Sequence, residues 1–107
     1  MRHVFPLQLA ARLADPGQPP PLLLDVRETW EFDLCHIDGS VHMPVQKVPL
    51  RFQELDPARE TVVICHHSMR SQRVAAFLEH RGFTAVCYLF GGIHAWAVDA
   101  DPAMRRY

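Results

Sequence analysis

Short apolar runs alternate with helix-like stretches along this chain, and this alternation constrains the fold more than any other feature. Residues 22–26 (LLLDV), 61–64 (TVVI) and 85–89 (AVCYL) are runs of four or five residues, rich in Leu and Val. Such continuous runs are typical of strands buried on both faces. Residues 40–43 form a further short run that ends at Pro44, and we expect a strand there too.

Helical patterns occupy the intervals between these strands. Pro6 suits a first helical position, and the next apolar residues, Leu7, Leu9 and Leu13, share one face. We expect further helices over residues 29–34, 47–55, 71–81 and 93–96. Strands that alternate with helices predict an α/β fold with a mainly parallel sheet covered on both faces. Trp30, Phe32 and Trp96 are the aromatic candidates for its core.

Length and composition predict one domain spanning residues 1–107. A net charge of −1 gives no electrostatic reason to expect nucleic acid or a membrane surface as a partner. No targeting segment or bilayer-spanning stretch is apparent. The three cysteines form an odd set without a CxxC pair, so we expect a cytoplasmic location and no zinc site.

The functional signal is concentrated where the run 61–64 delivers Cys65 to a polar turn that leads into the helix expected from Ser71. A thiol at this position faces the first N–H groups of a helix, whose partial positive charge favours an anion. The same field favours a thiolate near neutral pH. Arg70 adds a fixed cation, so the pattern predicts a cysteine nucleophile at Cys65.

Four motifs in order resemble the rhodanese family of single-domain sulfurtransferases. They are LDVRE with WEF (residues 24–32), CHIDGS (35–40), CHHSMRS (65–71) and GGIHAW (91–96). The resemblance implies a rhodanese-like three-layer α/β/α fold with a five-stranded, mainly parallel sheet. Two departures from the family pattern are Asp38 and Ser40, which stand where proline and alanine are usual.

The same resemblance implies a mechanism. Cys65 would take a sulfane sulfur from a donor such as thiosulfate or a protein persulfide, and would pass it to a thiophilic acceptor such as cyanide or a thiol. The persulfide would lie in a cradle of backbone N–H groups formed by His66, His67, Ser68, Met69, Arg70 and Ser71. Neither a metal nor an organic cofactor is implied. The ending of the chain, residues 99–107, resembles that of rhodanese domains fused behind adenylyltransferases that load sulfur-carrier proteins, so a protein acceptor is plausible and this tail should pack on the domain.

Two other functions stay open. Phosphatases and arsenate reductases on related folds have a Cys-x5-Arg loop, whereas here four residues separate Cys65 from Arg70, which favours a single sulfur atom over a phosphoryl group. A binding module without turnover is the second, because Ser68 replaces a usual glycine. A positive φ at Ser68 would cost about 1 kcal/mol.

Several other polar residues have a structural explanation. We expect Asp25 and Arg27 to form an ion-pair network that ties the next helix to the sheet, although they could border the mouth of the site. Adjacent histidines rarely point at one ion, so His66 and His67 predict a loop entrance and no metal site. Residues assigned to packing or local hydrogen bonds are His36, Cys35 and Cys87, with Cys35 also a possible resolving thiol.

Overall fold

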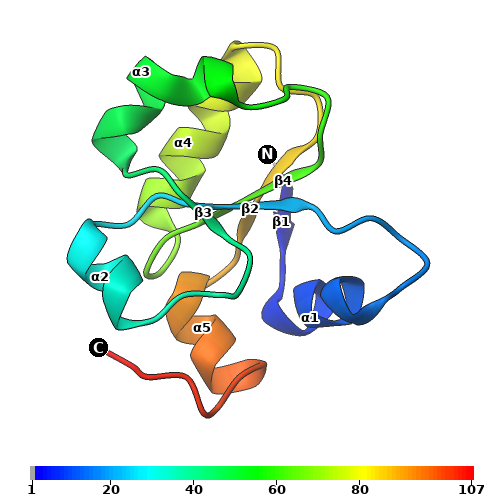
Figure 1. Ribbon diagram of the computed structural model, residues 1–107, viewed down its shortest axis with the longest axis vertical. Coiled ribbons are helices and arrows are strands. Elements are labelled where there is room, and N and C mark those ends of the chain that lie inside the picture. Colours follow the sequence, from blue (N-terminus) through cyan, green and yellow to red (C-terminus); the bar gives the residue numbers. More distant parts are fainter. Residues whose placement is uncertain (1) are drawn as a thin grey trace.

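Five parallel strands form one sheet at the centre of the computed structural model, which describes residues 2–107 (Figure 1). The strands are β1 (Arg2–Val4), β2 (Leu22–Asp25), β3 (Val41–His42), β4 (Thr61–Ile64) and β5 (Val86–Leu89). Their order across the sheet is β1-β5-β4-β2-β3, and every neighbouring pair is parallel. The predicted parallel five-stranded α/β fold is therefore confirmed. Met1, the first residue of the predicted domain, lies outside the described residues.

Helices cover both faces of this sheet (Figure 1). They are α1 (Pro6–Ala14), α2 (Thr29–Leu34), α3 (Val48–Arg51), α4 (Met69–His80) and α5 (Gly92–Asp99), and short 3₁₀ turns (Val45–Lys47 and Phe52–Glu54) flank α3. Helices α1 and α5 contact one another on one face, whereas α3 and α4 lie on the other. None of the helices in the described range is long and apolar enough to cross a membrane.

Successive residues of each buried strand point to opposite faces, so the sheet divides the core into two clusters. Val63 and Cys65 pack with residues of α3 and α4 in one cluster. Val62 and Ile64 pack with residues of α1 and α5 in the other. This alternation already places the Cys65 side chain on the α4 side of the sheet.

Three elements differ most from the sequence-based expectation: strand β1, the helix expected over residues 47–55, and the start of helix α4. Strand β1 was not expected, because an edge strand of three residues with exposed Arg2 and His3 lacks an apolar run. The helix expected over residues 47–55 is broken into a four-residue α-helix between two 3₁₀ turns. Helix α4 begins at Met69, two residues before the expected Ser71, so the cradle loop is shorter than expected and its last residues are helical.

The aromatic core prediction is only partly right. Trp96 is buried, at 7% exposure, whereas Trp30 is 61% exposed and does not belong to the core. Trp30 instead packs edge-on against the ring of Tyr107, with centroids 5.4 Å apart. Phe32 is half-buried between His36 and His42, at centroid distances of 3.9 and 4.5 Å. The i,i+4 spacing of Trp30 and Leu34 fits an apolar helix face, but it does not reveal whether the core lies against that face.

Helix α5 is docked tightly on the loop that follows β4. The Ile93 N–H donates to the Cys65 carbonyl over 2.8 Å, and the His94 N–H donates to the His66 carbonyl over 3.0 Å. Gly92 permits this approach because a Cβ there would lie 2.3–2.5 Å from the carbonyl oxygens of residues 65–67. The backbone of the loop is thus fixed by the first turn of α5.

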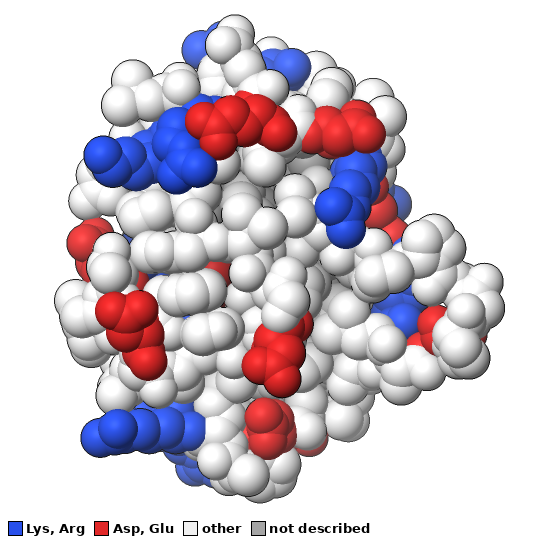
Figure 2. All heavy atoms as spheres, viewed as in Figure 1, with Lys and Arg blue, Asp and Glu red and all other residues white. Residues whose placement is uncertain are grey.

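Charges of both signs are interspersed on the molecular face in Figure 2, with no extended patch of one sign. This distribution agrees with the small net charge of −1. The face offers no electrostatic footprint for a polyanion.

We predict that Gly92→Ala destabilises the protein by more than about 3 kcal/mol, because the new methyl group must displace backbone carbonyls. Gly39→Ala is the matched control: Gly39 also has a positive φ, of 83°, but open space at its Cβ. It should cost only about 1–2 kcal/mol of backbone strain. Urea unfolding of both variants measures the difference, and equal losses would contradict the docking argument.

Candidate active site

Cys65 lies directly beyond the carboxyl end of β4, between the ends of β2 and β5, and is 1% exposed. Its thiol donates a hydrogen bond to the hydroxyl of Ser71 over 3.3 Å. The same hydroxyl donates to the Ser68 carbonyl over 2.9 Å, so its lone pairs face the sulfur. The thiol therefore has one defined polar partner at the first turn of α4.

The loop around this thiol is rich in unpaired donors. Within the described chain, the backbone N–H groups of residues 66–71 have no protein acceptor, whereas the carbonyls of Cys65, His66 and Ser68 are all bonded. No side chain caps the N-terminus of α4. Consecutive free N–H groups before and at a helix N-terminus create a concavity that favours an anion.

Ser68 does not strain this loop. Its φ is −155°, and within residues 2–107 only glycines have a positive φ. The free-energy cost that a positive φ would impose on Ser68 therefore does not arise. Its hydroxyl instead accepts a hydrogen bond from the Gly91 N–H over 2.8 Å, which links the loop to the turn before α5. A glycine at this position could not make that bond.

Arg70 is held by a carboxylate from α2. Its two terminal nitrogens lie 2.6 and 2.9 Å from the two carboxylate oxygens of Glu31, a bidentate arrangement. The pair raises the pKa of Arg70, and the thiolate form of Cys65 contributes a smaller part of that rise. Arg70 is thus a fixed cation at the edge of the loop.

Glu31 is buried, at 4% exposure, and ionised. Burial alone would raise the pKa of this carboxyl, but hydrogen bonds from Arg70, the Glu28 N–H and Tyr107 outweigh it and lower the pKa to about 2. The Tyr107 hydroxyl donates to Glu31 over 2.7 Å. The same hydroxyl accepts from Arg27 over 3.0 Å. The tail therefore packs on the domain, as the resemblance of residues 99–107 implied, and closes a polar network behind Arg70.

Asp25 and Arg27 form a fully buried ion pair with a closest distance of 2.7 Å. Burial opposes the charge of Arg27, yet its contacts with Asp25 and Tyr107 raise its pKa. Arg27 also donates to the carbonyl of Glu31 within α2 and to that of Cys35 at its C-cap. Both residues have no exposed surface, so they tie α2 to the sheet and do not line the mouth of the site.

The remaining predicted loop residues occupy the outer rim. His67 and Met69 are exposed, and Met69 is 71% exposed at the start of α4. His66 is half-buried, with its ring stacked between His67 and Tyr107. Burial, with smaller contributions from the charges of His67, His94 and Arg70, lowers the pKa of His66. A neutral imidazole is therefore its main form near pH 7.

Sequence reasoning missed Glu31, Tyr107 and His94 as residues of this region. Two of them lie inside quoted motifs, but nothing in the spacing paired Glu31 with a residue 39 positions away. The third, Tyr107, was treated as part of a packed tail without an assigned partner. A buried carboxylate in the first turn of α2 needs a cation nearby. This requirement is the signal that could have suggested a basic partner for Glu31.

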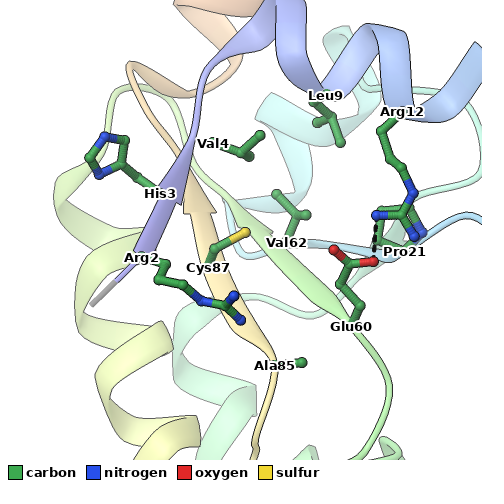
Figure 3. Close-up of a pocket in the computed structure, with 10 residues that line it drawn as sticks. All are labelled: Arg2, His3, Val4, Leu9, Arg12, Pro21, Glu60, Val62, Ala85 and Cys87. Carbon is green, nitrogen blue, oxygen red and sulfur yellow. Dashed lines mark ion pairs between the residues drawn. The ribbon is translucent and has the colours of Figure 1, made fainter.

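A separate cavity of about 240 Å³ lies at the amino ends of β1, β4 and β5 (Figure 3). Cys87 and Val62 line it, and an Arg12–Glu60 ion pair of 2.6 Å closes one side. Burial raises the pKa of the Cys87 thiol, which disfavours a thiolate there. The cavity is at the opposite edge of the sheet from Cys65 and is not part of the candidate site.

Residues 6–99 match the family described as Rhodanese-like domain. The chain is 38% identical over 103 residues to "Adenylyltransferase and sulfurtransferase MOCS3-1" of Zea mays, covering 90% of this chain but 22% of that protein. It is 35% identical to "Sulfurtransferase" of Allochromatium vinosum (88% and 86% covered). It is 34% identical to "Thiosulfate sulfurtransferase GlpE" of Pseudomonas syringae (86% and 84% covered). The chain thus spans about a fifth of the first relative and most of the other two.

Solved structures agree with the fold. The rhodanese-related protein from Thermoplasma volcanium superposes with a TM-score of 0.83 at 25% identity, over 94% of both chains. The Rhodanese-like domain protein from Staphylococcus aureus gives a TM-score of 0.83 at 24% identity, over 90% of this chain and 91% of that one. The layered architecture predicted from the motifs is therefore confirmed.

The low pKa of Glu31 generates a prediction about acid stability. A carboxyl whose folded pKa is about 2, against 4.5 normally, contributes stability that is complete above pH 4.5 and is lost as the pH falls toward 2. We expect Glu31→Gln to be less stable than wild type at pH 7, by up to about 3 kcal/mol, and the difference to narrow below pH 4.5. Urea unfolding between pH 7 and 3 measures this.

The control for this experiment is Glu54→Gln. Glu54 also pairs with an arginine, Arg51, over 3.0 Å, but both side chains are exposed. Its removal should change stability little at any of these pH values. A pH-independent difference between Glu31→Gln and wild type would contradict the assigned ionisation.

Proposed function

The chain belongs to the rhodanese-like domain family, and we propose that it transfers sulfane sulfur through a persulfide on Cys65. The sulfurtransferases among its relatives support the transferase class. The observation that carries the proposal is the buried thiol of Cys65 at the centre of a loop whose N–H groups, residues 66–71, have no protein acceptor. The donor, the acceptor and the covalent intermediate are parts of this proposal.

In the first step, the Cys65 thiolate attacks the outer sulfur of thiosulfate. A bond forms between Sγ and that sulfur, the bond to the sulfonate sulfur breaks, and sulfite leaves with the electron pair. The product is an anionic Cys65 persulfide. A protein persulfide reacts in the same way, with a cysteine thiolate as the leaving group. The sum of the charges is unchanged in both cases, so no oxidant or reductant is required.

In the second step, an acceptor removes the outer sulfur. Cyanide or a thiolate attacks it, the sulfur–sulfur bond breaks, and its electron pair returns to Sγ as thiolate. The product with cyanide is thiocyanate, and with a thiol it is a new persulfide. The protein then returns to its starting form. Donor and acceptor bind in turn and never at the same time, which is a ping-pong mechanism.

The cradle suits these charge movements. Negative charge stays on sulfur atoms near Cys65 throughout, and preorganised N–H dipoles stabilise such charge without reorganising during the reaction. The Ser71 hydroxyl already contacts Sγ and can turn to donate to a thiolate or persulfide. Arg70 adds a positive charge whose position is fixed by Glu31.

The same features argue against phosphoryl chemistry. The loop has four residues between Cys65 and Arg70, and both terminal nitrogens of Arg70 already bind Glu31. An oxyanion that needed a bidentate arginine would have to displace that carboxylate. The sulfur of a persulfide needs no such displacement.

Burial of Cys65 restricts the donor and acceptor. Only a small anion, or a narrow extended group such as the end of a protein carrier, would reach a thiol that is 1% exposed, and the exposed His67 and Met69 lie on the adjacent rim of the loop. The name of the maize relative, which joins an adenylyltransferase to a sulfurtransferase, supports a protein acceptor for this domain as well. Three free cysteines fit a reducing compartment such as the cytoplasm.

We predict that thiosulfate adds one sulfur atom to the wild-type protein and none to Cys65→Ser, as measured by intact-protein mass spectrometry. Cys87→Ser is the matched control, since it removes a half-buried thiol at the other edge of the sheet and should retain the adduct. Cyanide should discharge the adduct as thiocyanate. An equal adduct on Cys65→Ser would overturn the proposal.

The rival functions give different outcomes in parallel assays. Hydrolysis of an aryl phosphate that depends on Cys65 would favour a phosphatase. A protein that forms no adduct with thiosulfate or with a persulfide donor, and hydrolyses no phosphate, would be a binding module. In either case, failure to form the sulfur adduct on Cys65 would exclude the proposed sulfur transfer.

Arg70→Lys should raise the KM for thiosulfate by about tenfold, because lysine keeps the charge but cannot make the paired contacts with Glu31 that fix its position. Arg73→Lys is the control, on an exposed face of α4 away from Glu31. Steady-state kinetics with thiosulfate and cyanide measures both variants. Unchanged kinetics for Arg70→Lys would show that the arginine does not assist the anionic donor.

A further inference from the structure

Three histidines from two elements converge beside the loop. His66 and His67 follow Cys65, and His94 lies in the first turn of α5. One ring nitrogen of each lies within 4.8 Å of the corresponding nitrogen of the other two. We propose that these three imidazoles form a binding site for a divalent transition metal ion, with zinc as the representative.

The backbone that carries these side chains is fixed. His94 donates its N–H to the carbonyl of His66 over 3.0 Å, so two of the three ligands are joined directly through the main chain. The missing side chain of Gly92 lets α5 lie against the carbonyls of residues 65–67. A ligand set on such a backbone loses little additional chain entropy when it binds an ion.

Ring packing also restrains one of the side chains. The His66 ring is stacked between those of His67 and Tyr107, at centroid distances of 4.3 and 4.1 Å and interplanar angles of 28° and 19°. The His94 ring lies 5.4 Å from that of His67 and 6.0 Å from that of His66. The three rings therefore occupy one cluster on the side of the loop that faces α5 and the tail.

The chemistry of the ligand set selects the class of ion. Neutral imidazole nitrogen suits zinc, nickel and copper, whereas calcium and magnesium need oxygen ligands. Three histidines leave a fourth tetrahedral position for water or another ligand. Nitrogens on a tetrahedral zinc ion lie about 3.4 Å apart, given Zn–N distances of about 2.0–2.1 Å. The side chains of His67 and His94 are exposed and can rotate to close the remaining gap.

Surrounding charges neither create nor complete this site. The charge of Glu31 acts on His66, but its carboxylate is engaged by Arg70. Arg105 and Arg106 line the small cavity beside His66 and His94. The affinity for the ion must therefore come from the imidazole nitrogens. Removal of any one of the three histidines should then weaken binding.

The sequence alone argued against a metal because two adjacent histidines seldom share an ion. The fold adds a third histidine from 27 positions further along the chain, through the docking of α5. The proposal does not depend on sulfur transfer, since none of the ligands is Cys65.

The test is isothermal titration of the Cys65→Ser protein with Zn²⁺, so that the thiol cannot supply a ligand. We expect one ion per chain, and His94→Ala in the same background should weaken binding by at least about tenfold, because even an outer-shell change weakens metal sites by 10–100-fold. His80→Ala is the matched control: His80 is exposed at the end of α4, outside the cluster. It should leave the affinity unchanged.

Co²⁺ provides an independent readout. In wild type we expect visible ligand-field bands without a thiolate-to-cobalt charge-transfer band, and loss of those bands in His94→Ala. Circular dichroism of the zinc-free variants establishes that they are folded. Absence of binding to Cys65→Ser, a thiolate band in wild type, or equal affinities of His94→Ala and His80→Ala would each overturn the three-imidazole site.

Discussion

The guanidinium of Arg27 is the buried charge on which the carboxyl edge of the sheet depends. It has no exposed surface, and its five N–H donors are used by groups from β2, α2 and the tail. Asp25 neutralises its charge, the carbonyls of Glu31 in α2 and of Cys35 at its C-cap accept from it, and the Tyr107 hydroxyl accepts from the remaining donor. Loss of one partner from such a buried pair costs about 3–5 kcal/mol, because the remaining charge is left without compensation. The contacts of Arg27 therefore hold the end of β2, helix α2 and the tail together.

That order extends to the loop of residues 65–71 through shared hydrogen bonds. Tyr107 joins Arg27 to Glu31, and Glu31 in turn fixes Arg70. The two arginines are each matched by a carboxylate, so the positive charge that Arg70 places at the edge of the loop is partly offset by Glu31. The positive potential at the thiol must then come chiefly from the free backbone N–H groups of the loop. Dipoles that are fixed in the backbone can stabilise negative charge on the sulfur without reorganising.

The sequence predicted the strands and the thiol position, because local residue patterns determine both. Buried parallel strands appear as apolar runs, and a thiol at the end of one such run is recognisable without a structure. Side-chain pairs across the fold leave no periodic signal, so Glu31, Tyr107 and His94 could not be joined to the loop in advance. Trp30 was misplaced for a related reason: its spacing fits an apolar helix face, but α2 is short and turns that face toward the tail. The start of α4 at Met69 depended on capping geometry, which sequence patterns locate only within a few residues.

The pleat of β4 explains how a sulfur site and a cluster of imidazoles can occupy one loop. Cys65 belongs to the core cluster on the α4 side of the sheet, where its thiol meets Ser71. His66 follows it on the other side and stacks on Tyr107, which packs on the α5 cluster. Neighbouring side chains of an extended chain point to opposite sides, and the contacts of Cys65 and His66 follow this alternation beyond the end of β4 at Ile64. The proposed persulfide would be held by backbone N–H groups and the proposed ion by imidazole nitrogens, so the two would not compete for a ligand. His67, one of the three imidazoles, also lies on the rim of the loop, so a bound ion would stand beside the proposed entrance.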